Sequence, residues 1–305
     1  MNHFKSDLNS KLVGLIGNPL DHSVSPKLHN ALYQYYGINA VYLPFVLEEE
    51  QLPDFLHAAK TLKMSGFGVT MPFKDKILRY IDDAEESAKM FNCVNQVQIR
   101  PDGSTHGIAT DGLGMCQAIE HTGFRISGKN AMVLGAGAIS GVIGYELAQR
   151  GAQRVVFFNR TLEKAREIAK KVCQTTGVTT DYKPLERSEL DAVAPESQLV
   201  VQCTSLGMYG MNQDFDYLGF IDLLPEGSLV ADAIYNPECT SILAKARQRG
   251  LTTVDGVQML VWQLLRNLEH NVSFRGVEEE GLKYADECMR SFIRSKDPKA
   301  SEAEA

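Results

Sequence analysis

Residues 131–141 read AMVLGAGAISG, a short apolar run that breaks at two glycines and continues in a helical pattern. Gly135 permits a tight turn after a strand, and Gly137 lets backbone N–H groups approach a pyrophosphate at the helix N-terminus. Ala136 and Ala138 are the small residues between and after them. A glycine-rich turn without a ligand is the alternative for so short a motif. The stretch therefore predicts a strand–loop–helix unit and, if other residues support it, a dinucleotide site.

Such support comes from residues 159–164, at the end of the next apolar run. An NAD site usually has an acidic residue here, which accepts a hydrogen bond from the ribose 2′-hydroxyl. The chain instead offers Asn159, Arg160, Thr161 and, one helical turn on, Lys164. These side chains donate to a 2′-phosphate, which an acid would repel. A solvated helix start is the alternative, but beside the glycine loop we expect NADP(H) rather than NAD.

Outward from this unit, short apolar runs alternate with amphipathic stretches along most of the chain. The apolar runs are uninterrupted and rich in β-branched residues, which is typical of parallel strands buried on both faces. They are 12–16, 41–46, 66–70, 131–134, 154–158, 199–202 and 229–233. The helical patterns are 26–36, 50–62, 112–121, 139–149, 163–173, 239–248, 257–270 and 277–294. The alternation predicts an α/β, doubly wound fold.

The length of 305 residues suggests two domains, at about 150 residues each. The alternation that starts at the glycine loop runs from 129 to about 254, and a separate α/β block of about 110 residues precedes it. The residues alone leave open which domain the last two helical stretches join. The charged tail, 295–305, is rich in Ala and Ser, and we expect it to be disordered.

The composition excludes several classes of protein. With 44% hydrophobic and 23% charged residues, the chain is an ordinary globular protein. Thirty-one Lys and Arg against 38 Asp and Glu give a formal charge of −7, so we expect no nucleic-acid partner. Six scattered cysteines without a CxxC pair predict free thiols and no metal site. No run approaches the ~20 apolar residues of a membrane span and no signal-like start is visible, so we expect a cytoplasmic protein.

Polar residues are frequent at the strand ends and loops of the first block. Ser25 precedes a proline and is expected to be a helix N-cap, a role that leaves Ser23 unexplained. Lys74 follows the buried strand that ends near Thr70, and a surface lysine is its alternative. Asn95 is a polar residue within an apolar run, which favours a functional role for its side chain. For Asp111, at a helix start, capping is the alternative.

Eight motifs in this order resemble those of the shikimate/quinate dehydrogenase family. They cover the chain except its tail. They are GNPLDHSVSP at 17–26, VTMPFK at 69–74, CVNQ at 93–96, ATDG at 109–112, NRT at 159–161, TSLGM at 204–208, DAIYNPECT at 232–240 and GVQMLVWQ at 256–263.

The resemblance implies a reversible, NADP-dependent reduction of 3-dehydroshikimate to shikimate, in aromatic amino-acid biosynthesis. Dehydrogenation of quinate or a related cyclohexane carboxylate is the alternative. It implies that the last helices return to the first domain, giving a substrate-binding domain of 1–110 plus 256–294 and an NADP-binding Rossmann domain of 111–255. The active site would lie in the cleft between them, in a monomer or homodimer.

The resemblance also implies roles for single residues. Ser23, Ser25 and Tyr235 would bind the substrate carboxylate, and Thr70, Asn95, Asp111 and Gln263 the ring hydroxyls. Thr204 and Gly256 would join the cofactor residues. Lys74 and Asp111 would form the catalytic pair. This pair suits the chemistry, because hydride transfer to a ketone leaves an alkoxide that needs a cationic proton donor.

Four positions depart from the commonest family pattern. Gly68 stands where the family has Asn, Gln96 where it has Thr, Ala109 where it has Asn, and Gln202 where it has Asn. We expect Gly68 to remove a hydroxyl contact and to open space. Three of the four positions adjoin proposed substrate residues, so we expect altered recognition of the ring.

Overall fold

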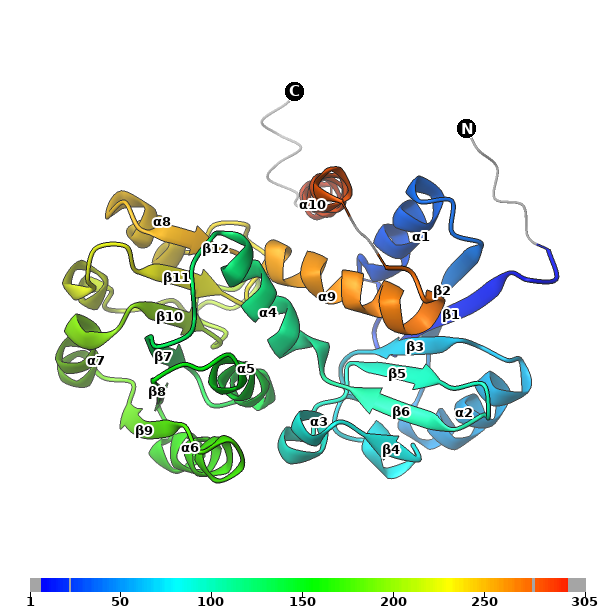
Figure 1. Cartoon of the computed structure of the whole chain (residues 1–305), viewed down its shortest axis with the longest axis horizontal. Helices are drawn as coiled ribbons and strands as arrows, with labels where there is room; N and C mark the ends of the chain where they lie inside the picture. Colours follow the sequence, from blue (N-terminus) through cyan, green and yellow to red (C-terminus); the bar gives the residue numbers. More distant parts are fainter. Residues whose placement is uncertain (1–6, 22, 276–277, 296–305) are drawn as a thin grey trace. The chain divides into compact units, whose positions relative to one another are not determined.

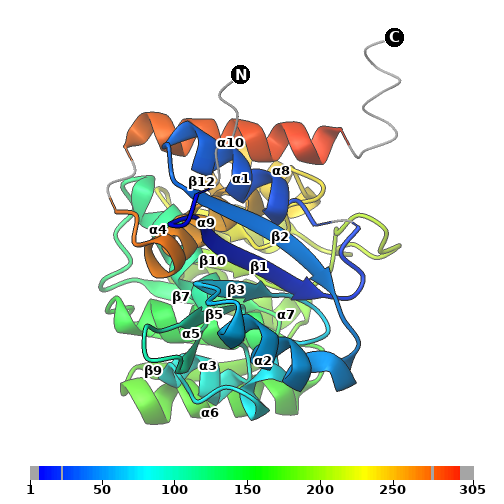
Figure 2. The same ribbon diagram turned by 90° about the vertical axis from the view of Figure 1, so that its right-hand side faces the viewer.

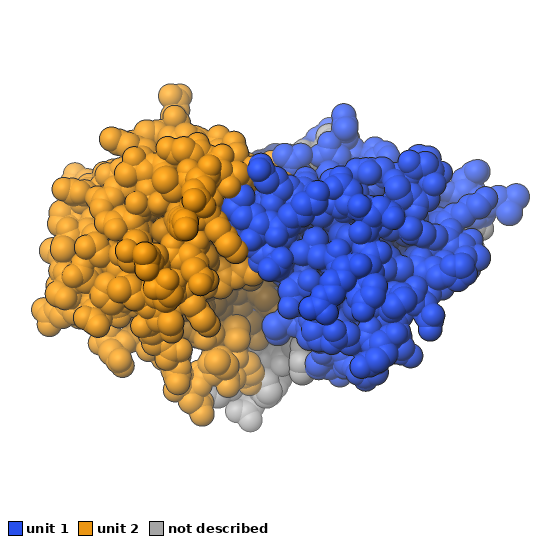
Figure 3. Space-filling view, turned by 90° about the horizontal axis from the view of Figure 1, so that it is seen from below, with its two compact units in different colours: residues 1–110, 263–305 blue, residues 111–262 orange. Residues whose placement is uncertain are grey.

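The computed structural model describes residues 7–21, 23–275 and 278–295. The chain divides into two compact units, drawn in different colours in Figure 3. Unit 1 comprises residues 1–110 and 263–305, and unit 2 comprises residues 111–262. Each unit has its own β-sheet (Figure 1), which confirms the predicted two-domain α/β architecture. Apart from Ser295, the tail that we expect to be disordered lies outside the described residues.

The sheet of unit 1 is mixed, with the strand order β2-β1-β3-β5-β6-β4. Its strands are β1 (Lys11–Gly17), β2 (Ala40–Val46), β3 (Gly66–Val69), β4 (Asp83–Ala84), β5 (Gln96–Ile99) and β6 (Thr105–Ile108). β1 is parallel to β2 and β3, whereas β5 is antiparallel to β3 and β6. The apolar runs 12–16, 41–46 and 66–70, predicted as parallel strands, correspond to β1, β2 and β3, and they are parallel as expected. β5 and β6 contain polar residues, QVQI and THGI, so a search for uninterrupted apolar runs misses them.

The helices of unit 1 cover both faces of this sheet (Figure 2). They are α1 (Ser25–Tyr35), α2 (Leu52–Thr61), α3 (Glu86–Phe91), the end of α9 (Gly256–Val272) and α10 (Glu279–Arg294), with short 3₁₀ helices at 49–51 and 77–79. On the α2 face, Phe55 meets Phe67 of β3 edge to face, with ring centroids 5.1 Å apart. On the other face, His29 of α1 stacks on Tyr42 of β2 at 4.0 Å. α10 packs on α1 through the stacked rings of Tyr35 and Tyr284.

The sheet of unit 2 is entirely parallel, in the order β12-β11-β10-β7-β8-β9. Its strands are β7 (Asn130–Leu134), β8 (Arg154–Asn159), β9 (Thr179–Pro184), β10 (Leu199–Gln202), β11 (Leu229–Asp232) and β12 (Thr252–Val254). The order in which successive strands are added reverses between β7 and β10, because β8 and β9 lie on one side of β7 and β10 to β12 on the other. This is the order of a doubly wound dinucleotide-binding fold, whose ligands bind at the carboxyl ends of the strands beside the reversal. The Rossmann-type prediction is confirmed.

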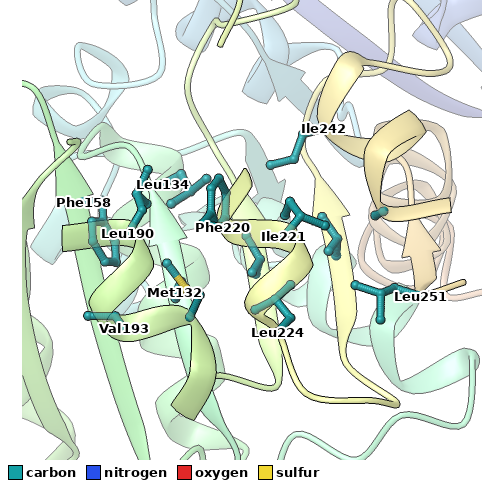
Figure 4. Packing of buried hydrophobic residues seen from close by; sticks show 14 of the residues in the cluster. Met132, Leu134, Phe158, Leu190, Val193, Phe220, Ile221, Leu224, Ile242 and Leu251 are labelled. Atoms are coloured by element: carbon teal, nitrogen blue, oxygen red, sulfur yellow. The ribbon is translucent and has the colours of Figure 1, made fainter. Parts of the chain in front are cut away.

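One face of this sheet packs against α7, the 3₁₀ helix at Gly219–Leu223 and α8 (Figure 4). The helices of unit 2 are α4 (Thr110–His121), α5 (Ala138–Gln149), α6 (Leu162–Thr176), α7 (Arg187–Val193), a 3₁₀ turn at Ala194–Glu196, α8 (Ser241–Gln248) and the start of α9. Met132 and Phe158 of adjacent strands meet Phe220 and Ile242 in one buried cluster. Burial of such side chains contributes about 1.5–3 kcal/mol each, and fixes the strand ends that carry the candidate site.

Helix α9 belongs to both units, because the division falls between Trp262 and Gln263. Residues 256–262 of the helix are assigned to unit 2 and residues 263–272 to unit 1. Asp255 and Gln258 start the helix with reciprocal bonds, in which each side chain accepts a hydrogen bond from the other's backbone N–H at 3.0 Å. None of the described helices is long and apolar enough to cross a membrane.

Candidate functional site

Backbone hydrogen bonds gather several predicted residues at the carboxyl end of β3. Thr70 directly follows the strand, and its N–H donates to the carbonyl of Ile16 near the end of β1 at 3.0 Å. Its own carbonyl accepts from Phe73, which turns the chain toward Lys74. The carbonyl of Lys74 then accepts from Val94 at 2.8 Å. Lys74 is thus held against the segment that carries Asn95, with a half-buried side chain.

Asn95 is the centre of this arrangement. Its carbonyl accepts from Val69 at 2.8 Å, and its N–H donates to Ile108 at 3.1 Å. Its side-chain Oδ1 accepts from the backbone N–H of Thr110 at 2.8 Å and from the Thr110 hydroxyl at 3.2 Å. Asp111, which is 2% exposed, follows directly in the first turn of α4. The chain therefore brings Lys74, Asn95 and the backbone next to Asp111 to one edge of the sheet.

The amide nitrogen of Asn95 is available for a ligand. The residue is 5% exposed, and Nδ2 has no hydrogen-bond partner among the described residues. Leaving a buried amide N–H group unpaired costs about 1–3 kcal/mol, so such a group in a folded protein usually donates to something. A substrate hydroxyl or carbonyl would satisfy it.

Ser23 and Ser25 lie on the loop after β1 and at the start of α1. The expected N-cap role of Ser25 is wrong, because Ser25 is the first helical residue and Val24 occupies the cap position. The hydroxyl of Ser23 instead accepts the N–H of Ser25, at 3.4 Å. Since the cap residue Val24 makes no side-chain cap bond, side-chain capping is absent from the start of the described α1 and does not account for Ser25.

The two remaining predicted substrate residues lie elsewhere in the chain. Gln263 is the first residue of α9 assigned to unit 1, and it is half-buried. Tyr235 belongs to unit 2, on the loop after β11, and is 39% exposed. The structure thus groups Thr70, Lys74 and Asn95 in unit 1, whereas Tyr235 is carried by the other unit.

Gly68 does not open space, contrary to expectation. A Cβ at this position would lie 2.6 Å from the hydroxyl of Tyr42 and 3.0 Å from Cδ1 of Leu15. The Tyr42 hydroxyl is also in hydrogen-bond contact with the Gly68 backbone. The missing side chain is therefore replaced by a tyrosine from β2.

Gln96, which directly follows the proposed substrate residue Asn95, is occupied by a contact within unit 1. It is fully buried, and its Nε2 donates to Oδ1 of Asn271 on α9 at 2.7 Å. Gly66 makes the approach possible, since a Cβ there would lie 2.4 Å from the same oxygen. Two residues on, Gln98 donates to the carbonyl of His270, which directly precedes Asn271. These bonds attach α9 to the sheet, and no periodicity in the sequence indicates them.

In unit 2, the glycine loop lies at the reversal between β7 and β10. Gly135 has φ +113°, and a Cβ there would lie 3.0 Å from the Cys203 backbone, so both conformation and close approach require glycine. Gly137 has φ −96° and nothing within 4 Å of a Cβ. Among the described residues no contact explains why Gly137 lacks a side chain, whereas a pyrophosphate at the exposed start of α5 would.

The residues predicted to select NADP meet at the start of α6. Asn159 ends β8, and its amide donates to the carbonyl of Thr161 at 2.9 Å. Thr161 occupies the N-cap of α6 but makes no side-chain cap bond within the described structure. Arg160 and Lys164 are exposed beside it. A helix N-terminus with two exposed cations and no acid at position 159 suits a 2′-phosphate.

Thr204 and Gly256 have structural roles that the sequence did not indicate. The side chain of Gln202 accepts from Thr204 N–H at 2.6 Å and donates to the carbonyls of Thr204 and Leu206, so this buried glutamine folds the loop after β10. Gly256 lets α9 approach the loop after β11, since a Cβ would lie 2.5 Å from the Ile234 carbonyl. Gln202, one of the four departures from the family pattern, therefore holds the backbone of the loop after β10 in place.

One buried carboxylate near these loops has a perturbed pKa. Burial raises the pKa of Asp232, at the end of β11, to about 6, with Asp255 and Asp214 adding to the effect. Hydrogen bonds from Thr240 and the Ile234 N–H act in the opposite direction. The sequence motif at 232–240 contains Asp232 and Thr240, but only its tyrosine received a predicted role. Among the described residues, no group of three His, Cys, Asp or Glu is arranged to hold a metal.

Comparison with known proteins extends over both units. The family model for the shikimate dehydrogenase substrate binding domain matches residues 15–97, and that for shikimate/quinate 5-dehydrogenase matches residues 117–214. A shikimate dehydrogenase (NADP(+)) from Alkaliphilus oremlandii (strain OhILAs) is 36% identical over 255 residues, 83% of this chain and 88% of the relative.

Solved structures resemble the whole fold. Shikimate 5-dehydrogenase from Listeria monocytogenes, in complex with shikimate and NAD, has a TM-score of 0.85 and 27% identity over 93% of this chain and 97% of its own. The ligand-free 5-ketofructose reductase of Gluconobacter sp. strain CHM43 has a TM-score of 0.83 and 27% identity over 93% and 99%. On the strength of both family models and the 36% identical relative, the chain belongs to the shikimate dehydrogenase family.

Proposed function

We propose that this protein is an NADP-dependent shikimate dehydrogenase, which interconverts 3-dehydroshikimate and shikimate. The observation that carries the proposal is the convergence of Thr70, Lys74 and Asn95, with a buried Asn95 Nδ2 that no described residue accepts from. The 36% identical relative named for this activity supports the same substrate and cofactor.

The cofactor that the residues fit is NADP(H). Gly135, Ala136, Gly137 and Ala138 would hold its pyrophosphate at the start of α5, where Gly137 leaves the space of a side chain open. Asn159, Arg160, Thr161 and Lys164 would bind the adenosine 2′-phosphate, and Thr204 and Gly256 would line the nicotinamide end. When bound, NADPH supplies the hydride.

Lys74 and Asp111 would manage the proton of this reaction. In the reducing direction the ring ketone becomes an alkoxide, and its oxygen takes a proton from the Nζ of Lys74. In the oxidising direction, Nζ accepts that proton from the ring hydroxyl. The Asp111 carboxylate would hold the ammonium group in place.

The remaining residues would bind and orient the substrate. Hydroxyls of Ser23, Ser25 and Tyr235 would donate to the carboxylate, and the side chains of Thr70, Asn95 and Gln263 would bind ring hydroxyls. A cytoplasmic monomer or homodimer is part of the same proposal, in line with free thiols at all six cysteines.

Two of the four departures support shikimate over quinate as the substrate. Gly68 adds no room for a further ring substituent, because Tyr42 fills the position. Gln96 is buried and donates to Asn271 on α9, so its side chain is engaged within the protein. Neither residue enlarges the site for quinate, which carries one hydroxyl more than shikimate.

The test is nicotinamide absorbance with shikimate or quinate, each combined with NADP or NAD. We expect turnover with shikimate and NADP, and loss of at least about a thousandfold in kcat for Lys74→Ala with NADP affinity retained. Lys76→Ala is the matched control, since Lys76 is two residues on and pairs with Glu49. A Lys74→Ala variant with a wild-type rate would refute the role of Lys74.

A further inference from the structure

The loop of residues 233–239, between β11 and α8, is fastened at both ends to one carboxylate. Asp232 ends β11 and is fully buried. Its Oδ1 accepts the N–H of Ile234 at 2.9 Å, and its Oδ2 accepts the hydroxyl of Thr240 at 2.5 Å. Ile234 is next to the first residue of the loop and Thr240 follows the last. A single side chain therefore closes the loop that carries Tyr235.

Thr240 uses its hydroxyl for the bond to Asp232 and not to cap the following helix. It occupies the N-cap of α8, where a threonine hydroxyl normally accepts a backbone N–H and stabilises the helix. No such side-chain cap bond is present in the described helix. The hydroxyl donates instead to Asp232, in an environment where Thr240 is only 2% exposed.

The loop is also held by its neighbours in unit 2. The carbonyl of Asn236 accepts from Tyr209 N–H at 2.9 Å, and the carbonyl of Ile234 accepts from Gly256 N–H at 3.2 Å. Beside Thr240, the hydroxyl of Ser241 donates to Asp214 Oδ1 at 2.7 Å. The backbone on both sides of Tyr235 is thus fixed, while the Tyr235 ring is 39% exposed.

We propose that Asp232 and Thr240 are positioning residues that hold Tyr235 ready to bind the substrate carboxylate. The inference rests on the proposed function, in which Tyr235 donates to that carboxylate. A hydroxyl on a fixed loop binds without an ordering cost, whereas one on a loose loop must first be ordered. Because the carboxylate is remote from the reacting carbon, the loss should fall on substrate binding and not on the chemical step.

The experiment compares Thr240→Val, which keeps the shape and removes the hydroxyl, with Thr240→Ser, which keeps the hydroxyl. Thr176→Val is the matched control, because the Thr176 hydroxyl donates to the Val172 carbonyl in the same unit. We expect Thr240→Val to raise the KM for shikimate about tenfold, with kcat and the Kd for NADP within about twofold of wild type. Thr240→Ser and Thr176→Val should stay within about twofold in all three quantities.

Hydrogen exchange supplies a readout that does not depend on turnover. In Thr240→Val, amides of residues 233–239 should exchange faster, whereas those of α6 should not. A wild-type KM in this variant, or a parallel loss of kcat and NADP affinity, would overturn the positioning role. Failure of the wild-type protein to oxidise shikimate would refute the proposed function. Unchanged hydrogen exchange at 233–239 in Thr240→Val would instead show that the Asp232–Thr240 bond does not hold the loop. Asp232→Asn replaces Thr240→Val in both assays if the valine variant does not fold.

Discussion

Replacing Gly68 with alanine should destabilise unit 1 through a clash with a single hydroxyl. The new Cβ would lie 2.6 Å from the Tyr42 hydroxyl and 3.0 Å from Leu15 Cδ1, well inside the ~3.5–4.0 Å of an ordinary contact. Tyr42 has little freedom to move away, because it is 1% exposed and its ring stacks on His29 at 4.0 Å.

The expected cost is about 1–3 kcal/mol, the usual price of overpacking a close-packed interior. It should appear as a lower urea midpoint and a Tm lower by about 2–4 °C per kcal/mol. Tyr42→Phe alone should cost about 1 kcal/mol, through loss of the contact between its hydroxyl and the Gly68 backbone. In the Tyr42→Phe background, Gly68→Ala should cost at least about 1 kcal/mol less than in wild type, because the nearest atom is gone.

Gly137→Ala is the control for the stability measurement. Gly137 has nothing within 4 Å of a Cβ and an ordinary φ of −96°, so alanine there should change stability by less than about 0.5 kcal/mol. Circular dichroism in urea gives the free energies for all four variants. Equal costs of Gly68→Ala in wild type and in the Tyr42→Phe background would refute the clash, as would a Gly68→Ala protein with wild-type stability.

Three other perturbations have expected outcomes. Arg160→Ala should weaken NADP by about tenfold or more and NAD by less than about twofold, in fluorescence titrations; equal losses would make Arg160 an ordinary surface charge. Gln96→Leu should cost about 1–3 kcal/mol in urea unfolding, because Asn271 Oδ1 is left buried and unpaired, and no loss would contradict the role of this bond in docking α9. Asp232 has its pKa raised to about 6 in the folded protein from 3.8 when unfolded, so its contribution is present below pH 4 and is lost as pH rises through 6. The unfolding free energy of wild type minus that of Asp232→Asn should therefore fall by about 2 kcal/mol between pH 4 and pH 7, and a flat difference would mean that the carboxyl titrates normally.

The parallel core of each unit could be predicted from the sequence because its strands are buried on both faces. β1, β7 and β8 are uninterrupted apolar runs, and Gly135 marks its turn through a conformation that only glycine adopts readily. β9 reads TTDYKP and lies at a sheet edge, where polar residues are tolerated, so apolar patterning does not detect it.

Side-chain interactions between distant segments could not be read in the same way. A glycine in a motif does not say whether its missing side chain leaves room, and at Gly68 a tyrosine from another strand takes the room. The N-cap expectation for Ser25 failed by one residue, because the helix begins at the serine and its neighbour Ser23 contacts the first turn. The site residues predicted from motifs are polar and lie at strand ends. Which of them come together depends on the order of the strands in the sheet, and the motifs do not give that order.

The split of unit 1 across the chain has a consequence for synthesis on the ribosome. Gln96 and its partner Asn271 are 175 residues apart, with the whole of unit 2 between them. At ~5–20 residues per second, Gln96 leaves the ribosome about 9–35 s before Asn271 does. Unit 2 is synthesised within that interval and is complete before Asn271 emerges, whereas the face of β3 and β5 that later receives α9 stays open to water throughout. The domain that begins the chain is therefore finished last, and its amide-lined sheet face must remain soluble until the C-terminal helices arrive.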